Sequence, residues 1–66
     1  MIVTIDGIGV DVPAGSSLGD ILSSRGEPLD HVLVELNGRL VRSADLAAKI
    51  LSEGDVIEVI LPAIGG

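Results

Sequence analysis

The chain has 66 residues, which is enough for one domain with one small hydrophobic core. Hydrophobic residues make up 47% of it, yet Phe, Tyr, Trp and Cys are all missing, so the core has to be aliphatic. The lack of cysteine excludes a disulfide, a thiolate metal site and a cysteine nucleophile. The single histidine excludes a multi-histidine metal site.

Ten acidic residues against four basic ones give a net charge of −6. Nucleic acid is therefore not expected as a partner, because phosphate binding needs a basic surface. A protein partner with a positive surface fits the charge, and plain solubility is the alternative explanation. Residues 1–6 lack the basic leader of a signal peptide, and no apolar run approaches the ~20 residues of a membrane span. We therefore expect a cytoplasmic protein without membrane contact.

The first segment predicts a hairpin. Residues 3–6 alternate apolar and polar, which is typical of a half-buried strand. We expect Gly7-Ile8-Gly9 to turn the chain and residues 10–12 to return as the second strand.

A short helix is predicted next. Ser17 followed three residues later by Asp20 fits the capping pattern of a helix start. Apolar residues at spacings of three and four then form one stripe, made of Leu18, Ile21 and Leu22. Gly26 is suited to the left-handed position that ends such a helix, and the stripe has to be buried against the hairpin.

The second half predicts three more strands. Residues 32–36 alternate, with Val32, Val34 and Leu36 on one face, and Asn37-Gly38 favours a type I′ turn into a short strand at 39–41. Residues 43–51 predict a brief helical passage. Its inward-facing residues are expected to be Leu46, Ala47, Ile50 and Leu51. After a turn at 53–55, residues 56–61 form the last strand.

The last strand is apolar on both faces. If Ile57, Val59 and Leu61 point to the core, then Val56 and Ile60 point outward beside Glu58. Leu33 and Ile2 are expected on the same outer face. An apolar cluster next to the end of the chain predicts a docking patch for a partner.

The sequence ends on Gly65-Gly66. Because glycines have no side chains, the last carboxylate sits on a chain narrow enough to enter a tunnel in another protein. The five residues after Leu61 span at most about 17 Å when extended. We predict a flexible tail over residues 62–66, with Ile64 and Gly65 contacting the partner; a frayed terminus without function is the alternative.

The order of the elements predicts a single α+β domain over residues 1–66, with one mixed sheet of four to five strands packed on one main helix. Three segments together resemble the ThiS and MoaD family of ubiquitin-like sulfur carriers, and the ThiS type most closely: residues 32–38, 54–59 and 65–66. The resemblance covers essentially the whole chain and implies the β-grasp fold. Pro62 departs from the family, in which an uninterrupted strand-like segment is more usual here.

The resemblance implies a function. The Gly66 carboxylate would be adenylated with ATP by a ubiquitin-activating-type enzyme of the ThiF and MoeB kind. Sulfur from a persulfide protein would then replace AMP, leaving a thiocarboxylate that donates sulfur to thiazole synthase, in thiamine biosynthesis, or to an equivalent acceptor. The chain itself would bind no cofactor or metal, would be monomeric alone, and would act as a protein cosubstrate rather than an enzyme.

Other functions of the same fold stay open. A MoaD-like carrier would serve molybdopterin or tungstopterin synthesis, or another sulfur pathway. A ubiquitin-like modifier would be conjugated to lysine, although Lys49 is the only lysine here that could accept a second copy. A pure interaction domain would have an inert tail. The residues predicted to contact a partner are Leu33, Val56, Glu58, Ile60, Ile64 and Gly65.

Overall fold

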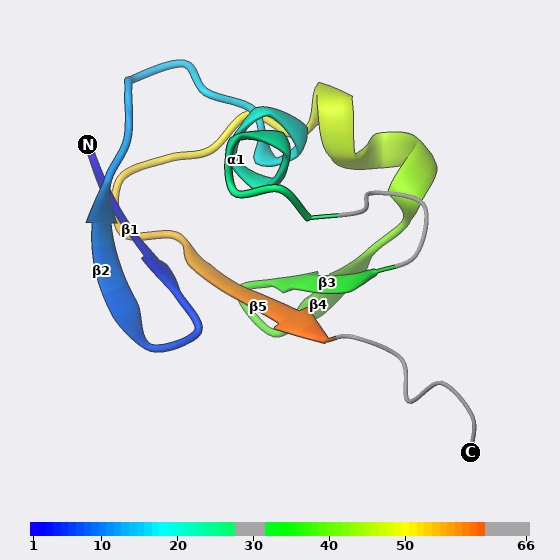
Figure 1. Cartoon of the computed structure of the whole chain (residues 1–66). Coiled ribbons are helices and arrows are strands. Elements are labelled where there is room, and N and C mark those ends of the chain that lie inside the picture. The colour runs from blue at the N-terminus through cyan, green and yellow to red at the C-terminus, as the bar shows by residue number, and fades with distance from the viewer. Residues whose placement is uncertain (28–31, 61–66) are drawn as a thin grey trace.

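The computed structural model describes residues 1–27 and 32–60. Within them the chain forms five strands, one α-helix and one 3-10 helix, in the predicted order (Figure 1). The elements are β1 (Ile2–Ile5), β2 (Ile8–Asp11), α1 (Leu18–Ser24), β3 (Leu33–Leu36), β4 (Arg39–Val41), η1 (Ser43–Ala48) and β5 (Val56–Ile60). No helix in the described part is long and apolar enough to cross a membrane.

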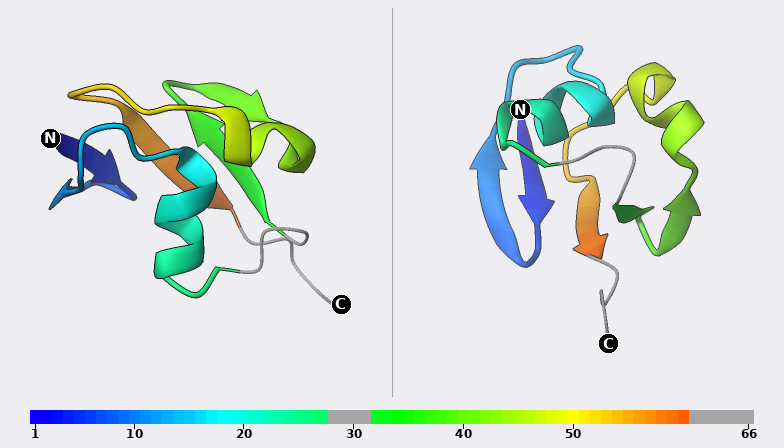
Figure 2. Two further views of the ribbon diagram at one scale, coloured as in Figure 1. Left: turned by 90° about the horizontal axis from the view of Figure 1, so that it is seen from above. Right: turned by 45° about the vertical axis from the view of Figure 1, so that its right-hand side comes forward.

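The five strands form one sheet in the order β2-β1-β5-β3-β4. β1 and β5 are parallel, whereas the other neighbouring strands are antiparallel. The last strand of the chain therefore lies at the centre of the sheet. Both helices lie on one face of this sheet, as two different views show (Figure 2). The predicted mixed sheet packed on one main helix is confirmed, and we call the face turned away from α1 the outer face.

The core lies between the sheet and α1 and is entirely aliphatic, as the composition requires. All three residues of the predicted α1 stripe are buried in it. The predicted inward faces of the first and third strands are buried too. Side chains with less than 2% of their surface exposed are Val3, Ile5, Leu18, Leu22, Val34, Leu46 and Ile57.

The turn of the first hairpin differs from the prediction. Asp6 and Gly7 form it, with φ angles of 49° and 84°, and Ile5 pairs directly with Ile8. A two-residue turn of this kind needs positive φ at both positions, and Asp-Gly supplies it. The expected turn at Gly7-Ile8-Gly9 is wrong because Ile8 already belongs to β2.

The ends of α1 follow the prediction. The Ser17 hydroxyl accepts a hydrogen bond from the Asp20 amide at 3.0 Å, and the Ser17 amide donates to the Asp20 carboxylate at 3.2 Å. Gly26 has a φ of 77°. The Glu27 amide then donates to the Leu22 carbonyl at 3.0 Å, which satisfies one of the free carbonyls at the helix end.

Residues 43–51 are less helical than predicted. Leu46 and Leu51 are buried as expected, but Ala47 is exposed and Ile50 is 58% exposed. The 3-10 helix η1 repeats every three residues, so Ala47 does not share a face with Leu46. The chain after η1 is extended, and Ile50 pairs there with Ser17. Successive side chains of an extended chain point to opposite sides, so Leu51 points inward and Ile50 points outward.

The N-cap of α1 gives a stability prediction. Ser17→Ala removes the acceptor for the Asp20 amide and should lower the free energy of unfolding by about 1 kcal/mol in a urea titration. Ser23→Ala is the matched control, because Ser23 is exposed in the last turn of α1 and should change stability by less than about 0.5 kcal/mol. Equal losses for the two variants would contradict the capping role.

Candidate docking face and the base of the tail

The candidate site begins with the outer face of β5. Along this strand Ile57 is fully buried, whereas Val56 and Ile60 are 42% and 41% exposed, and Glu58 is exposed between them. Residues two apart on a strand share a face, so these three side chains form one row on the outer face. The predicted alternation is therefore confirmed for the described residues, and Val59 packs against the core as expected.

β3 supplies the other half of this face. Leu33, which is 47% exposed, pairs directly with Ile60 across the two strands. Side chains that are direct cross-strand partners have Cβ atoms about 5 Å apart and contact one another. Leu33 and Ile60 thus form an exposed apolar pair at the end of β5 that leads to residues 61–66. We call Leu33, Val56, Glu58 and Ile60 the docking face; Ile2, 47% exposed on β1, lies on the same side of the sheet.

The register also places Glu35 directly opposite Glu58. Glu35 is half-buried, and its other cross-strand neighbour is Leu40 of β4. The sequence placed Glu35 on the outer side of its strand but gave no reason to connect it with Glu58. Only the adjacency of β3 and β5, which joins segments more than twenty residues apart, brings the two carboxylates together.

The end of β5 is held from the other side by Asp6. The Val59 amide donates to the Asp6 carboxylate at 3.0 Å, and the Asp6 amide donates to the Ile57 carbonyl at 2.9 Å. β1 ends at Ile5, so the Asp6 side chain takes the place of a neighbouring strand beside Val59. Sequence analysis missed this role, although the Asp-Gly pair is a visible turn signal.

The start of β5 is fixed by Asn37 in the turn between β3 and β4. Its side-chain oxygen accepts from the Val56 amide at 2.9 Å, and its side-chain nitrogen donates to the Asp55 carboxylate at 3.1 Å. The φ angles of 53° at Asn37 and 81° at Gly38 confirm the predicted turn type. Side chains from two turns thus position both ends of the strand that carries the docking face.

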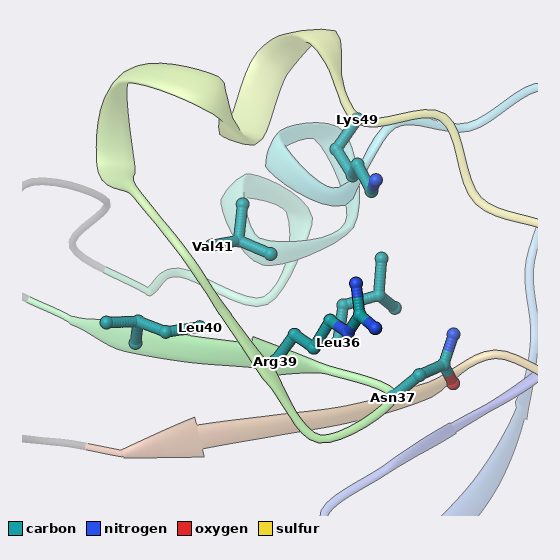
Figure 3. Close-up of a pocket in the computed structure, with 6 residues that line it drawn as sticks. All are labelled: Leu36, Asn37, Arg39, Leu40, Val41 and Lys49. Atoms are coloured by element: carbon teal, nitrogen blue, oxygen red, sulfur yellow. The ribbon is translucent and has the colours of Figure 1, made fainter.

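A hollow of about 390 Å³ lies beside the same turn (Figure 3). It is lined by Leu36, Asn37, Arg39, Leu40, Val41 and Lys49. The cationic side chains come from β4 and from the segment after η1. Within residues 1–27 and 32–60 no cluster of three or more metal-binding side chains is found.

The remaining predicted site residues lie outside the described residues. They are Gly66, Gly65 and Ile64, together with Leu61 and Pro62 of the expected last strand and tail. The structure therefore places four of the predicted partner-binding residues on one face, and it does not test the tail.

A model of the ThiS family matches residues 4–66 of the chain. The chain belongs to the ThiS family. It is also similar to the crystal structure of the thiamine biosynthesis protein ThiS from Geobacter metallireducens, with 26% identity, complete coverage of both chains and a TM-score of 0.86. The solution structure of a thiamine biosynthesis protein from the same organism is 29% identical over all of this chain and 87% of that one, with a TM-score of 0.77.

A third structure shows the fold alone. SAMP1 from Haloferax volcanii is 23% identical, with 98% of this chain and 97% of that chain covered and a TM-score of 0.64. A comparison with curated proteins gave no significant match. Together these findings confirm the ubiquitin-like β-grasp fold and support a role as a sulfur carrier. ThiS-like carriers are in general not enzymes, and they act with adenylating and sulfur-transfer enzymes.

The Asp6 contact predicts a local effect at the end of β5. Asp6→Gly removes the carboxylate but keeps a residue that adopts positive φ freely. Because the Val59 amide loses its acceptor, its hydrogen exchange should become faster and the protein should lose about 1 kcal/mol of stability. Asp6→Asn keeps a side-chain acceptor and tolerates the same φ, so the Val59 amide should exchange more slowly in this variant than in Asp6→Gly. Unchanged exchange at Val59 in Asp6→Gly would refute the contact.

Proposed function

We propose that this chain carries sulfur as a thiocarboxylate on Gly66, most directly for the thiazole part of thiamine. The observation that carries the proposal is the ThiS family match, which extends to residue 66. It is supported by the structural similarity to ThiS from Geobacter metallireducens, which covers the whole of both chains.

The chemistry needs an activated carboxyl group. A carboxylate is a poor electrophile, so an oxygen of the Gly66 carboxylate first attacks the α-phosphorus of ATP, releasing pyrophosphate and forming an acyl adenylate. The terminal sulfur of a persulfide then attacks the acyl carbon and AMP leaves. This step forms a carbon–sulfur bond and gives an acyl disulfide that keeps the sulfur–sulfur bond of the persulfide. A thiol then attacks the donor's sulfur in that bond, which forms a disulfide between the thiol and the donor and releases the thiocarboxylate on Gly66. In this proposal the adenylating enzyme, of the ThiF and MoeB kind, binds the ATP, and this chain binds no cofactor.

The folded part of the chain serves recognition in this proposal. The adenylating enzyme would contact the docking face, with Ile64 and Gly65 entering its active site ahead of Gly66. Two exposed aliphatic side chains, Leu33 and Ile60, lie beside each other at the end of the sheet that precedes the tail. Burying them in an interface is favourable, because apolar surface leaves water.

The sulfur-bearing group gives the first test. The chain is purified without a tag from its own cells, or incubated with ATP, the adenylating enzyme and a persulfide donor, and its intact mass is measured. We expect a species heavier by the difference between one sulfur and one oxygen atom, and no such species from a variant lacking Gly66. Transfer of that sulfur to thiazole synthase would assign the thiamine pathway.

Other outcomes of the same experiment separate the alternatives. Sulfur on Gly66 that only a molybdopterin-type or tungstopterin-type acceptor removes would indicate the MoaD-like function. A Gly66–lysine linkage would indicate a modifier. Unmodified chain under every condition would contradict the carrier function.

The docking face gives a second test. Leu33→Ser and Ile60→Ser each remove one exposed aliphatic side chain, so the kcat/KM of adenylation with this chain as substrate should fall about tenfold. Ile8→Ser is the matched control, since Ile8 is 67% exposed on β2 and faces away from the docking face. Thermal unfolding of each variant checks that it is folded. Equal rates for all three variants would remove these residues from the interface.

A further inference from the structure

Two carboxylates lie opposite each other on the outer face, and neither forms an ion pair with another of the residues that the structure describes. Glu35 and Glu58 are direct cross-strand partners. Like charges in this position destabilise a sheet, because their side chains are within a few ångströms of one another. The ion pairs formed among the described residues join Met1 to Asp11 and Arg42 to Asp45, and neither involves these two glutamates.

The carboxylate pair lies among exposed aliphatic side chains. Leu33 and Ile60 form the next row of the sheet on one side of the pair. Val56 lies two residues before Glu58 on β5, and Leu40, which is 61% exposed, is the cross-strand neighbour of Glu35 on β4. The outer face of the sheet therefore presents two negative charges with aliphatic side chains on three sides, while on the β1 side the Asp6 carboxylate lies beside Val59. Partner recognition commonly uses such a centre, since apolar neighbours exclude water from the polar contact.

This pattern of charge selects the kind of partner. A second copy of the chain packed on the same face would bring four carboxylates together. A wholly apolar partner would bury both charges without compensation, which is costly. A partner that presents one cation between apolar side chains satisfies both glutamates and covers the aliphatic residues around them.

Arginine fits this position better than lysine. Its guanidinium is planar, carries five donors in a fixed arrangement and is more weakly hydrated than an ammonium group. It can therefore donate to two neighbouring carboxylates at once while its plane lies against apolar side chains. Arginine is also enriched at the centres of protein interfaces, where lysine is depleted.

We propose that Glu35 and Glu58 together bind an arginine side chain of the adenylating enzyme, and that this contact determines which enzyme the chain recognises. The proposal rests on the proposed function for the identity of the partner. It adds Glu35 to the docking face and explains why an unfavourable pair of like charges is present there. In the free protein the Glu35 and Glu58 carboxylates repel each other, and in the complex the arginine between them offsets this repulsion.

The test compares three variants that each lose one negative charge. Glu35→Gln and Glu58→Gln change the carboxylate pair, whereas Asp45→Asn changes an exposed residue of η1. Binding of the full-length chain to the ThiF-type adenylating enzyme of the same organism is measured by calorimetry without ATP, at low and at high salt. We expect the Kd to rise about tenfold for each glutamate variant and to stay within about twofold for Asp45→Asn. The salt dependence of binding should become weaker only in the glutamate variants.

Thermal unfolding of the free chain gives a second readout. Removing one charge of an opposed pair should raise the midpoint of Glu35→Gln and Glu58→Gln above that of the unsubstituted chain, whereas Asp45→Asn, which loses the ion pair with Arg42, should not rise. A loss of binding that came from misfolding would instead lower it. Midpoints of the two glutamate variants that do not exceed that of the unsubstituted chain would contradict the repulsion on which the proposal depends.

Two results would overturn the proposal, and they differ from a failure of the proposed function. If the glutamate variants bind the enzyme as Asp45→Asn does, the pair does not bind a cation of that enzyme. If they bind it normally but self-associate in ultracentrifugation, the pair serves to prevent self-association. Because binding is measured without ATP, a chain that binds through both glutamates but never gains sulfur supports this proposal and refutes the carrier chemistry.

Discussion

The parallel pairing of β1 with β5 is the interaction on which the rest of the structure depends. It joins the first and last strands of the chain through Ile5 and Ile57, both of which are at most 1% exposed. Because β3 pairs with the other side of β5, this strand has a neighbour on both sides. Pairing β1 with β5 closes a loop of most of the chain, and the entropic cost of this closure has to be offset by burial in the aliphatic core under α1. The central position gives β5 one buried face and one exposed face, and it fixes the direction in which the chain reaches residue 60.

Local signals in the sequence predicted most of the elements correctly. The Ser17 and Asp20 capping pattern, the Asn37-Gly38 turn and the alternation of the strands each depend on residues a few positions apart, so the sequence alone contains them. The first turn was predicted at residues 7–9 because two of these three residues are glycines. The stronger signal is the Asp6-Gly7 pair, which begins one position earlier and forms the turn. The segment after Ser43 was misjudged because a single apolar pattern fits both a 3-10 helix and an α-helix, and the two have different periods.

The candidate site could be predicted only in part, because its contacts are non-local. Alternation alone placed Val56, Glu58, Ile60 and Leu33 on outward faces, and their exposure agrees. Alternation cannot say which strands are neighbours or in what register. That information decides that Glu35 faces Glu58 and that the Asp6 carboxylate reaches the Val59 amide. The residues missed from the sequence are therefore those whose role depends on a partner far away along the chain.

The docking face also has to serve more than one partner if the chain carries sulfur. A carrier meets the enzyme that activates it and then the enzyme that takes the sulfur, so each complex has to dissociate quickly. A small apolar surface limits the lifetime of a complex, whereas a negative chain with a net charge of −6 is attracted rapidly by a basic partner. The opposed carboxylates on this aliphatic surface contribute to both fast and selective binding. They favour a partner that presents a matching cation, and they disfavour self-association and partners whose apolar surface carries no cation. The stability lost to their repulsion in the free protein is then the cost of selective and reversible binding.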